Sequence, residues 1–392
     1  MKKILIFSLA YYPSFASGAE IAIKEITDRI DPSDIEFHML TLLFDRTQPR
    51  EETIGHVVVH RVGFGGGYLS KMLYIPLATL KARSLHSKIR FDGMWSVMTY
   101  MLFPVVLAKF IGVRVPHLLT LQDGDPYEKV FKRWFIRPFT PLLDYGFRSA
   151  AMVSAISTYL ATWPPLRGYK GPVEVIPNGS SLQSAQEYSA QELTGLKQQL
   201  GKKEGDIFLI SVSRLVHQKG IDTVIHALPH LPSNIRLLVV GDGSDKDMLV
   251  RLAEGLGVSG RVIFTGQVDR TMTAKYRKIS DVFVSPSRSE GQGISFVSTM
   301  VSGLPMIATQ EGGLADFIFD AKRNPDKLTT AWAVDKDSPE QIVAAVKEIL
   351  ANPEQAAKVV ATAKKFAHEN YDWNVIAKSM RERVFGRVLF RI

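Results

Sequence analysis

The sequence contains no cysteine among its 392 residues. This absence excludes disulfide bonds, cysteine-ligated zinc, iron–sulfur clusters and thiol catalysis. It also fits a reducing compartment, and we therefore expect the chain to act in the cytoplasm. Long apolar runs are missing as well. The uncharged, largely apolar stretch at 94–108 is interrupted by Pro104, whereas a transmembrane helix needs about 20 apolar residues.

Two common catalytic signatures are also absent. There is no G-x-G-x-x-G, which disfavours a nicotinamide cofactor. There is no G-x-S-x-G, which disfavours a hydrolase with a nucleophile elbow. Apolar residues make up 46% of the chain, so we expect folded globular domains rather than disorder. The length predicts about two of them.

Acidic residues are fewer than basic residues. Lys and Arg total 48 against 39 Asp and Glu, a net charge of +9. Residues 1–177 hold 21 basic and 15 acidic residues, so most of the excess lies in the first half. Such a balance favours anionic partners, namely nucleic acid, acidic lipid or phosphorylated small molecules. Nucleic acid is disfavoured because no basic-aromatic nucleic-acid motif is present.

Short apolar runs alternate with amphipathic runs along the chain. In the first half they predict strands at 3–9, 37–43, 57–62, 93–98, 117–121 and 152–155, and helices at 19–30, 69–87, 100–111 and 129–148. In the second half they predict strands at 207–213, 235–240, 262–264, 281–285 and 306–309, helices at 221–228 and 245–256, and helix from Pro339 to the end. This alternation predicts an α/β fold of two doubly wound, Rossmann-like domains with parallel sheets covered on both faces.

Ligands of doubly wound sheets bind beyond the carboxyl ends of the strands, so the loops there are the places to look for chemistry. The loop at 8–20 leads into Gly18 at the start of a helix, where free N–H groups suit a phosphate, although a plain helix cap also explains this glycine. The loop at 211–220 carries Arg214 and Lys219. Two such cations can clamp a diphosphate, or they can simply be surface charges.

Two further loops follow later strands. The segment at 285–300 places Glu290 between small residues just before a helix, where a carboxylate can accept hydrogen bonds from sugar hydroxyls. The segment at 310–316 contains Gly312 and Gly313, whose exposed N–H groups could hold a phosphate.

These loops together resemble the retaining glycosyltransferases of family 4, which have the GT-B fold. The resemblance covers nearly the whole chain, and its most specific part is the second half. It rests on R-x4-K at Arg214 and Lys219, Val239-Val240-Gly241-Asp242-Gly243, Pro286-Ser287-x-x-Glu290-Gly291-x-Gly293, Ser302-Gly303-Leu304-Pro305, Gly312-Gly313, Val175-Ile176-Pro177-Asn178-Gly179 and Tyr371-Asp372-Trp373.

The resemblance implies two Rossmann-like domains that face each other across a cleft. Residues 1–177 would form the acceptor-side domain, residues 178–372 the domain for the nucleotide-sugar donor, and a helix at 373–392 would return to the first domain. The implied reaction moves a sugar from a nucleotide-sugar to a glycan or lipid-linked acceptor with retention of anomeric configuration, in polysaccharide or glycoconjugate biosynthesis. The nucleotide-sugar is a co-substrate, and neither a metal nor another cofactor is expected.

The resemblance also implies roles for individual residues. Arg214 and Lys219 would hold the diphosphate and stabilise the charge on the leaving group, while Glu290 and Asp123 would lie near the donor sugar. The implied donor-binding residues are Gly18, Ser213, Gly241, Gly291, Gly293, Ile294, Ser298, Gly312 and Gly313. Gln122 and Asp125 are acceptor-side candidates. Asp-x-Asp at 123–125, 245–247 and 335–337 is a metal-binding pattern in other transferases, but we interpret the last two as surface turns.

The sequence departs from the family pattern at three positions. The second acid of the family's E-x7-E signature, which binds the nucleotide ribose, is replaced by Ser298. Gln122 stands where many members have histidine, and Ser181 where an Asp often follows the Asn-Gly turn. Two alternatives therefore stay open: a partner subunit that binds nucleotide-sugar but has lost efficient catalysis, and a sugar-nucleotide epimerase.

Two segments combine cations with aromatic residues. The predicted helix at 129–148 carries Lys129, Lys132, Arg133, Arg137 and Arg148 beside four aromatic side chains, and the tail at 378–391 carries five cations against Glu382. Such a helix can lie on an anionic membrane at the inner face, which would suit a lipid-linked acceptor, or it can pack on the sheet with solvated cations. For the tail we expect packing against the first domain.

Overall fold

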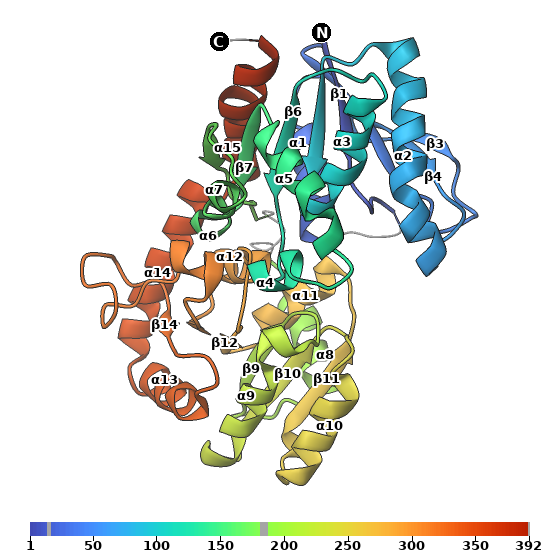
Figure 1. The fold of residues 1–392 in the computed structure, drawn as a ribbon. Helices are drawn as coiled ribbons and strands as arrows, with labels where there is room; N and C mark the ends of the chain where they lie inside the picture. Colours follow the sequence, from blue (N-terminus) through green and yellow to red (C-terminus); the bar gives the residue numbers. More distant parts are fainter. Residues whose placement is uncertain (14–16, 181–186, 391–392) are drawn as a thin grey trace. The chain divides into compact units, whose positions relative to one another are not determined.

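The computed structural model describes residues 1–13, 17–180 and 187–390. The chain divides into two compact units. The first unit comprises Met1–Asn178 together with Trp373–Ile392, and the second comprises Gly179–Asp372. Each unit has its own sheet and its own helices, as Figure 1 shows. Within the described residues, no helix is long and apolar enough to cross a bilayer.

The first unit is built on an eight-stranded sheet. Its strands are β1 (Lys2–Phe7), β2 (Ile35–Leu42), β3 (Glu51–Ile54), β4 (Val57–Val62), β5 (Gly93–Val97), β6 (His117–Leu121), β7 (Met152–Ala155) and β8 (Val173–Val175). They lie in the order β3-β4-β2-β1-β5-β6-β7-β8. All neighbours pair in parallel except β3 with β4. The parallel, doubly wound sheet predicted from the sequence is confirmed.

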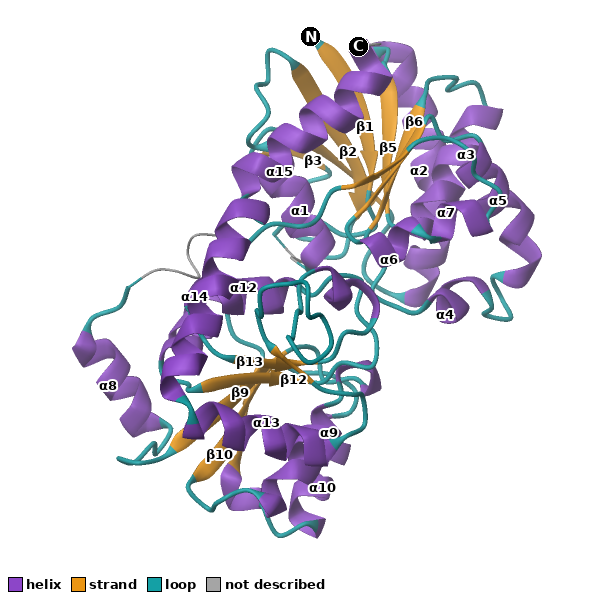
Figure 2. Cartoon of the chain, turned by 90° about the vertical axis from the view of Figure 1, so that its left-hand side faces the viewer, coloured by secondary structure: helices purple, strands orange, loops and turns teal. Residues whose placement is uncertain are grey.

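Helices cover both faces of this sheet (Figure 2). One face carries α1 (Gly18–Thr27), α15 (Trp373–Ser379) and the following π-helix (Met380–Phe390), and the other carries α2 (Tyr68–Ile89), α3 (Leu102–Phe110) and α5 (Thr140–Arg148). Successive side chains of a strand point to opposite faces. Ile4 and Ile6 therefore join the core under α1, whereas Leu5 and Phe7 join the core under α2 and α3. Phe385 packs edge-on against Trp95, which anchors the end of the chain in the first unit.

The second unit contains a six-stranded, fully parallel sheet. Its strands are β9 (Ile207–Val212), β10 (Ile235–Val240), β11 (Val262–Gly266), β12 (Val282–Ser285), β13 (Met306–Ala308) and β14 (Trp332–Ala333). Their order is β11-β10-β9-β12-β13-β14. Renumbered from the first strand of the unit, this is the order 3-2-1-4-5-6 of dinucleotide-binding sheets. The strand order reverses at β9, which pairs with β10 on one side and with β12 on the other.

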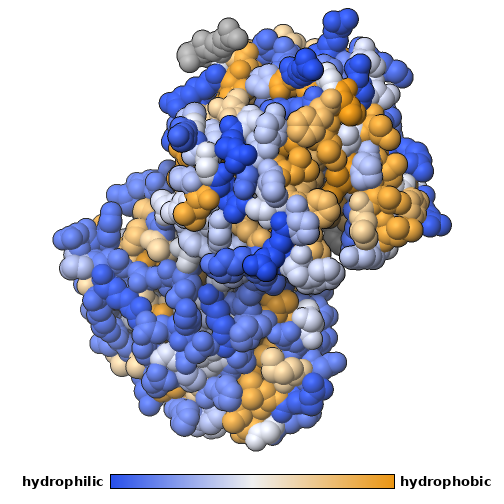
Figure 3. Space-filling model, viewed as in Figure 1, coloured by the Kyte–Doolittle hydropathy of each residue, from blue (hydrophilic) through white to orange (hydrophobic). Residues whose placement is uncertain are grey.

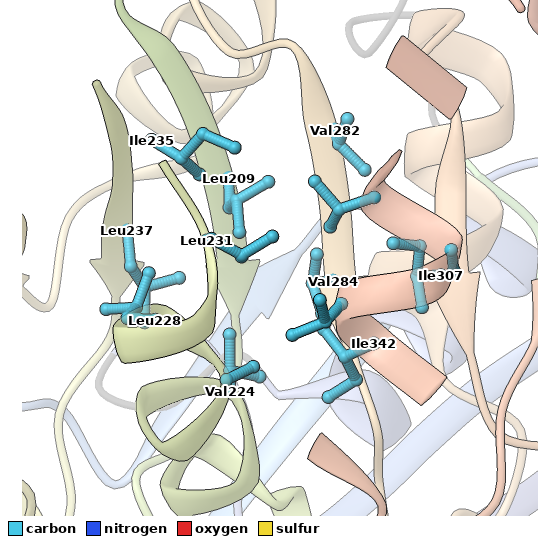
Figure 4. Packing of buried hydrophobic residues seen from close by; sticks show 14 of the residues in the cluster. Leu209, Val224, Leu228, Leu231, Ile235, Leu237, Val282, Val284, Ile307 and Ile342 are labelled. Carbon is cyan, nitrogen blue, oxygen red and sulfur yellow. The ribbon is translucent and has the colours of Figure 1, made fainter. Parts of the chain in front are cut away.

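Two apolar cores hold this sheet between its helices. The helices are α8 (Ala190–Gln199), α9 (Ile221–Ala227), α10 (Lys246–Gly255), α11 (Arg270–Lys278), α12 (Ile294–Ser302), α13 (Pro339–Ala351) and α14 (Pro353–Asn370). Leu209 of β9 packs with α9, α10 and α13, whereas Phe208 and Ile210 pack with α11 and α12. Figure 4 shows Leu209, Val224 and Ile342 converging in the first of these cores. Burial on both faces fixes the register of β9 and hence the place where its loop begins.

One helix prediction is wrong because of proline. The continuous helix expected at 129–148 is divided into α4 (Tyr127–Phe131), a 3₁₀ turn (Arg137–Phe139) and α5. Pro138 lies in the first turn of the 3₁₀ segment and Pro141 in the first turn of α5. The helix predicted from Pro339 onward is confirmed up to Phe390, apart from short breaks at Asn352 and between Asn370 and Trp373. Three short strands, β3, β8 and β14, lie where no strand was predicted. They have four, three and two residues, too few to show a periodic pattern.

Candidate functional site

The candidate site of the second unit lies at the carboxyl ends of β9, β12 and β13. These three strands are neighbours in the sheet, so the loops at 213–220, 286–293 and 309–313 leave it side by side. The crevice of a doubly wound sheet lies where the strand order reverses, between β9 and its neighbours. The most specific sequence motifs occupy these loops.

A buried ion pair joins two of the loops. Nζ of Lys219 lies 2.6 Å from Oε1 of Glu290, and their side chains are only 12% and 8% exposed. Ser287 Oγ donates to the same carboxylate oxygen at 3.2 Å. Thr309 Oγ1 in turn donates to the Ser287 carbonyl at 2.6 Å, which ties the loop after β13 to the loop after β12. The two charges compensate each other where either alone would be costly to bury.

Two glycines let the loops approach each other at backbone distance. Gly220 has φ +66°, and a Cβ there would lie 2.3 Å from the Pro286 carbonyl oxygen. Gly312 has φ +63°, and its Cβ would lie 2.2 Å from the carbonyl oxygen of Glu290. The N–H of Gly313 donates to the same carbonyl at 2.9 Å. Any side chain at these glycines would push the Glu290 loop away from its neighbours.

The other predicted glycines have structural explanations as well. A Cβ on Gly241 would lie 2.0 Å from the carbonyl oxygen of Ser213, so the turn after β10 packs directly on the loop after β9. Gly293 has φ +87° and precedes Ile294, the first residue of α12. Gly291 is buried beside Glu290. These positions shape the loops, and a donor-binding role for them stays a prediction.

Two polar groups at the end of β9 have no partner within the described residues. The hydroxyl of Ser213 is buried and makes no hydrogen bond with any residue that the structure describes. The next residue, Arg214, is exposed, and its guanidinium forms no ion pair or hydrogen bond in the part of the chain that the structure describes. A buried hydroxyl without a partner is costly, and each of the two groups can donate to an anionic oxygen.

Ser298 lies on α12 and is 8% exposed. Its hydroxyl lies 3.1 Å from that of Ser180, and either can donate. Its carbonyl accepts a hydrogen bond from Ser302. Two hydroxyls therefore occupy the position where the family signature has one carboxylate. Ser181, the other departure in this region, lies outside the described residues.

In the first unit, Asp123 is the predicted site residue whose pKa is shifted most. It follows β6, is 5% exposed, and accepts hydrogen bonds on Oδ2 from the Thr99 hydroxyl at 2.9 Å and the Thr99 N–H at 3.2 Å. Burial raises the pKa of Asp123 to about 6, and the hydrogen bonds from Thr99 oppose this rise. Met98, which precedes Thr99, has φ +74°, a left-handed conformation that is rare for such a side chain.

The neighbours of Asp123 have partners of their own. Gln122 is 9% exposed, and its Oε1 accepts a hydrogen bond from Asn178 Nδ2 at 3.2 Å. Asp125 forms ion pairs with Lys129 at 3.1 Å and Arg133 at 2.9 Å. These contacts tie the loop after β6 to the end of the first unit and to the start of the basic segment.

Gly18 is the first residue of α1. The Glu20 carboxylate, in the first turn of this helix, accepts hydrogen bonds from the N–H of Ser17 at 2.8 Å and from its hydroxyl at 2.5 Å. The helix start therefore carries an acidic group of its own, which favours plain capping at this position. A phosphate contact at Gly18 stays a prediction. Within the described residues, no group of three acidic or histidine side chains is arranged to hold a metal ion.

Sequence reasoning missed Arg288. This residue lies inside the Pro-Ser-x-x-Glu motif, and its guanidinium contacts Asp222 and Asp337, which were not singled out as site residues. Its position two residues before Glu290 was the available signal, but the partners come from segments far away in the sequence.

Comparison with known proteins identifies the class. The family profile for glycosyl transferases group 1 matches residues 194–366, and the profile for the glycosyl transferase 4-like domain matches residues 17–179. The fold agrees. The structure of Anabaena HepE in complex with UDP-glucose superposes with a TM-score of 0.79 at 20% sequence identity, covering 98% of this chain and all of the other. The fold is GT-B, and the chain belongs to the group 1 glycosyltransferases.

Two relatives illustrate the range of the family. An uncharacterized glycosyltransferase of Methanocaldococcus jannaschii is 26% identical over 394 residues, with 96% of each chain covered. The alpha-monoglucosyldiacylglycerol synthase of Streptococcus pneumoniae is 35% identical over 227 residues, which is 56% of this chain and 51% of the relative. The protein is thus a glycosyltransferase, as the motifs predicted.

Proposed function

We propose that the protein transfers a sugar from a nucleotide-sugar to a glycan or lipid-linked acceptor, with retention of configuration and without a metal ion. The observation that carries the proposal is the arrangement around the Lys219–Glu290 pair, at the reversal point of a sheet with the dinucleotide-binding strand order. Beside it lie a buried hydroxyl without a hydrogen bond, Ser213, and an exposed guanidinium without a partner among the described residues, Arg214.

The chemistry of these groups matches the needs of a leaving nucleoside diphosphate. As the glycosidic bond breaks, negative charge grows on the diphosphate, and fixed cations stabilise it more than they stabilise the bound donor. Arg214 and Lys219 supply two positive charges, and Ser213 supplies a hydroxyl donor. Glu290 offers a second carboxylate oxygen, Oε2, to sugar hydroxyls while Oε1 faces Lys219. No side chain has to act as a nucleophile if the acceptor attacks from the face that the diphosphate leaves.

The first unit is proposed to contact an anionic membrane at the cytoplasmic face, which suits a lipid-linked acceptor. Most exposed large hydrophobic side chains among the described residues lie between 64 and 145, including Tyr68, Leu69 and Met72 of α2, and Trp134, which is 82% exposed. Figure 3 shows apolar surface over α2 and α3. Apolar side chains beside cations favour binding to anionic lipid. The synthase named above, whose name gives a glucosylated diacylglycerol as its product, supports a lipid acceptor for this chain.

The experiment is a transfer assay on the full chain with UDP-glucose, GDP-mannose and ADP-glucose, followed by proton NMR. The H1–H2 coupling constant reports the configuration of a glucose product, and the one-bond C1–H1 coupling constant reports that of a mannose product. From a donor with an α-linked sugar, we expect a product in which the sugar is again α-linked, or a free sugar released as the α-anomer if water is the acceptor. The rate should be the same with and without EDTA. An inverted product, or activity abolished by EDTA and restored by Mg²⁺ or Mn²⁺, would contradict it. Nucleotide binding without any turnover would favour the partner-subunit alternative that Ser298 suggests.

A further inference from the structure

Arg288 connects the two loops that carry Lys219 and Glu290. Its backbone N–H donates to the carbonyl of Gln218 at 2.7 Å. Its Nη1 donates to the carbonyl of His217 at 2.5 Å. Both carbonyls belong to the short segment 217–220 that presents Lys219, so backbone and side chain of one arginine hold the same turn.

The guanidinium is itself fixed by two carboxylates. Nη1 and Nη2 donate to the two oxygens of Asp222, in the first turn of α9, at 2.9 and 2.7 Å. Nε donates to Oδ1 of Asp337 at 2.6 Å. Burial acts to raise the pKa of Asp222, but the hydrogen bonds and charge of Arg288 outweigh it and lower that pKa, so the pair is ionised at neutral pH. A forked arginine–carboxylate pair of this kind has little freedom to reorient.

Asp337 contributes a second, independent observation. Its φ of +59° lies in the left-handed region, which non-glycine residues seldom adopt. Residues held in such conformations occur most often where a site requires a particular geometry. Here the Asp337 carboxylate forms an ion pair with Arg288, although Asp337 lies 49 residues further along the chain.

We propose that Arg288 is a positioning residue, which holds the 217–220 turn so that the Lys219 ammonium faces the diphosphate of the donor. The inference rests on the proposed function, because it assigns the diphosphate to Lys219. Arg288 points its own charge at Asp222 and Asp337, and 15% of its side chain is exposed. The guanidinium is bonded to the 217–220 turn, Asp222 and Asp337. Arg288 therefore acts on the ligand through Lys219.

This role differs from that of an ordinary structural ion pair in one measurable respect. An arginine that only stabilises the fold would weaken binding of every ligand of the unit to a similar extent, or would lower the melting temperature alone. An arginine that positions Lys219 affects only ligands that carry the diphosphate. It also loses its effect once Lys219 is removed, because two residues that act through one another are not additive.

The experiment is calorimetric titration of UDP, GDP and ADP, and of the nucleoside that matches the strongest binder, against four forms of the full chain. These forms are the wild type, Arg288→Gln, Lys219→Ala and the double variant. Arg323→Gln is the matched control, since Arg323 also pairs with an acid in the second unit, Asp335 at 2.8 Å, but lies away from the site loops in the sequence. Arg288→Lys and Asp222→Asn are milder variants in case Arg288→Gln folds poorly, and thermal melting checks all of them.

The expected result is a Kd for the nucleoside diphosphate about tenfold or more higher in Arg288→Gln, the effect of a lost charged hydrogen bond. Binding of the nucleoside stays within twofold of wild type, and the double variant binds like Lys219→Ala. Equal weakening of nucleoside and diphosphate, additive effects in the double variant, or unchanged binding in Arg288→Gln would overturn the inference. If Lys219→Ala itself binds the diphosphate like wild type, the proposed function fails, and the inference fails with it.

Discussion

Nζ of Lys219 lies 2.6 Å from Oε1 of Glu290, although 71 positions separate the two residues in the sequence. They meet because β9 and β12 are neighbours in the sheet, so the loops that follow these strands leave it side by side. Without a ligand, Glu290 therefore neutralises the cation that we assign to the donor diphosphate. On this assignment, the donor diphosphate competes with Glu290 for Lys219, and this competition has measurable consequences.

Glu290→Gln should affect nucleotide and nucleotide-sugar in opposite directions. Removing the carboxylate charge frees Lys219 for the diphosphate, so the nucleoside diphosphate alone should bind several-fold more tightly. Transfer should fall at least about tenfold, because a charged hydrogen bond to the sugar is lost. Calorimetry and initial rates measure the two effects. Glu311→Gln is the control, since Glu311 is a nearby acid that pairs with Lys336 instead. Weaker binding of the nucleoside diphosphate in Glu290→Gln would argue against competition.

Ser298→Glu restores the acid that the family signature has at this position. If residue 298 faces the nucleotide ribose, the variant should bind the nucleotide about tenfold more tightly, since a charged hydrogen bond replaces a neutral one. Ser302→Glu, one turn further along α12, provides the control for an added charge. Titration of the nucleotide and of its 2′,3′-dideoxy analogue measures the effect. A gain that persists with the dideoxy analogue would show that the new carboxylate does not bind the ribose.

Asp123→Asn should change how stability depends on pH. The pKa of Asp123 is raised from 3.8 to about 6 in the folded protein, so the folded state binds more protons than the unfolded state between these values. Wild-type stability therefore falls as the pH rises from about 4 to 6, by up to about 3 kcal/mol. Asparagine keeps an acceptor for Thr99 and carries no charge, so the variant should melt like wild type near pH 4 and at a higher temperature at pH 7.5. Asp125→Asn, at a partly exposed ion-paired carboxylate, is the control. A melting difference that is the same at both pH values would contradict the assignment.

The double variant Trp134→Ser and Phe135→Ser should bind anionic vesicles at least about tenfold less tightly than wild type, because two apolar side chains no longer enter the interface. Sedimentation with vesicles of phosphatidylglycerol and phosphatidylcholine at two salt concentrations measures this. Leu328→Ser is the control, since Leu328 is 78% exposed but belongs to the second unit. Equal binding of the double variant and the wild type would show that Trp134 and Phe135 do not contact the membrane.

Much of the fold follows directly from the sequence, because both sheets are parallel and their strands are buried on both faces. The strands at 57–62, 117–121, 152–155 and 235–240 begin and end at the residues that their apolar runs predict. The antiparallel strand β3 was missed because it is short and three of its residues, Glu51 to Thr53, are polar at the exposed edge of the sheet. The helix predicted at 129–148 is broken because Pro138 and Pro141 cannot continue it, although the charge pattern extends across both.

The candidate site was predictable only in part. Motif spacing indicated Lys219 and Glu290, but their ion pair depends on which strands are neighbours, and sequence periodicity does not report strand order. Arg288 was missed for the same reason: its partners Asp222 and Asp337 lie 66 and 49 positions away. The Ser213 hydroxyl has no hydrogen-bond partner in the described part of the chain, and this is a property of packing that a single sequence cannot show.

The role of Lys219 is measured by calorimetric titration of UDP, GDP and ADP against the wild type and Lys219→Ala. We expect micromolar binding of one nucleotide by the wild type and a loss of at least about tenfold in Lys219→Ala, with an unchanged melting temperature. Equal binding of all three nucleotides by both proteins would indicate nonspecific attraction to a chain with a net charge of +9. That result would contradict the assignment of Lys219 to the donor diphosphate.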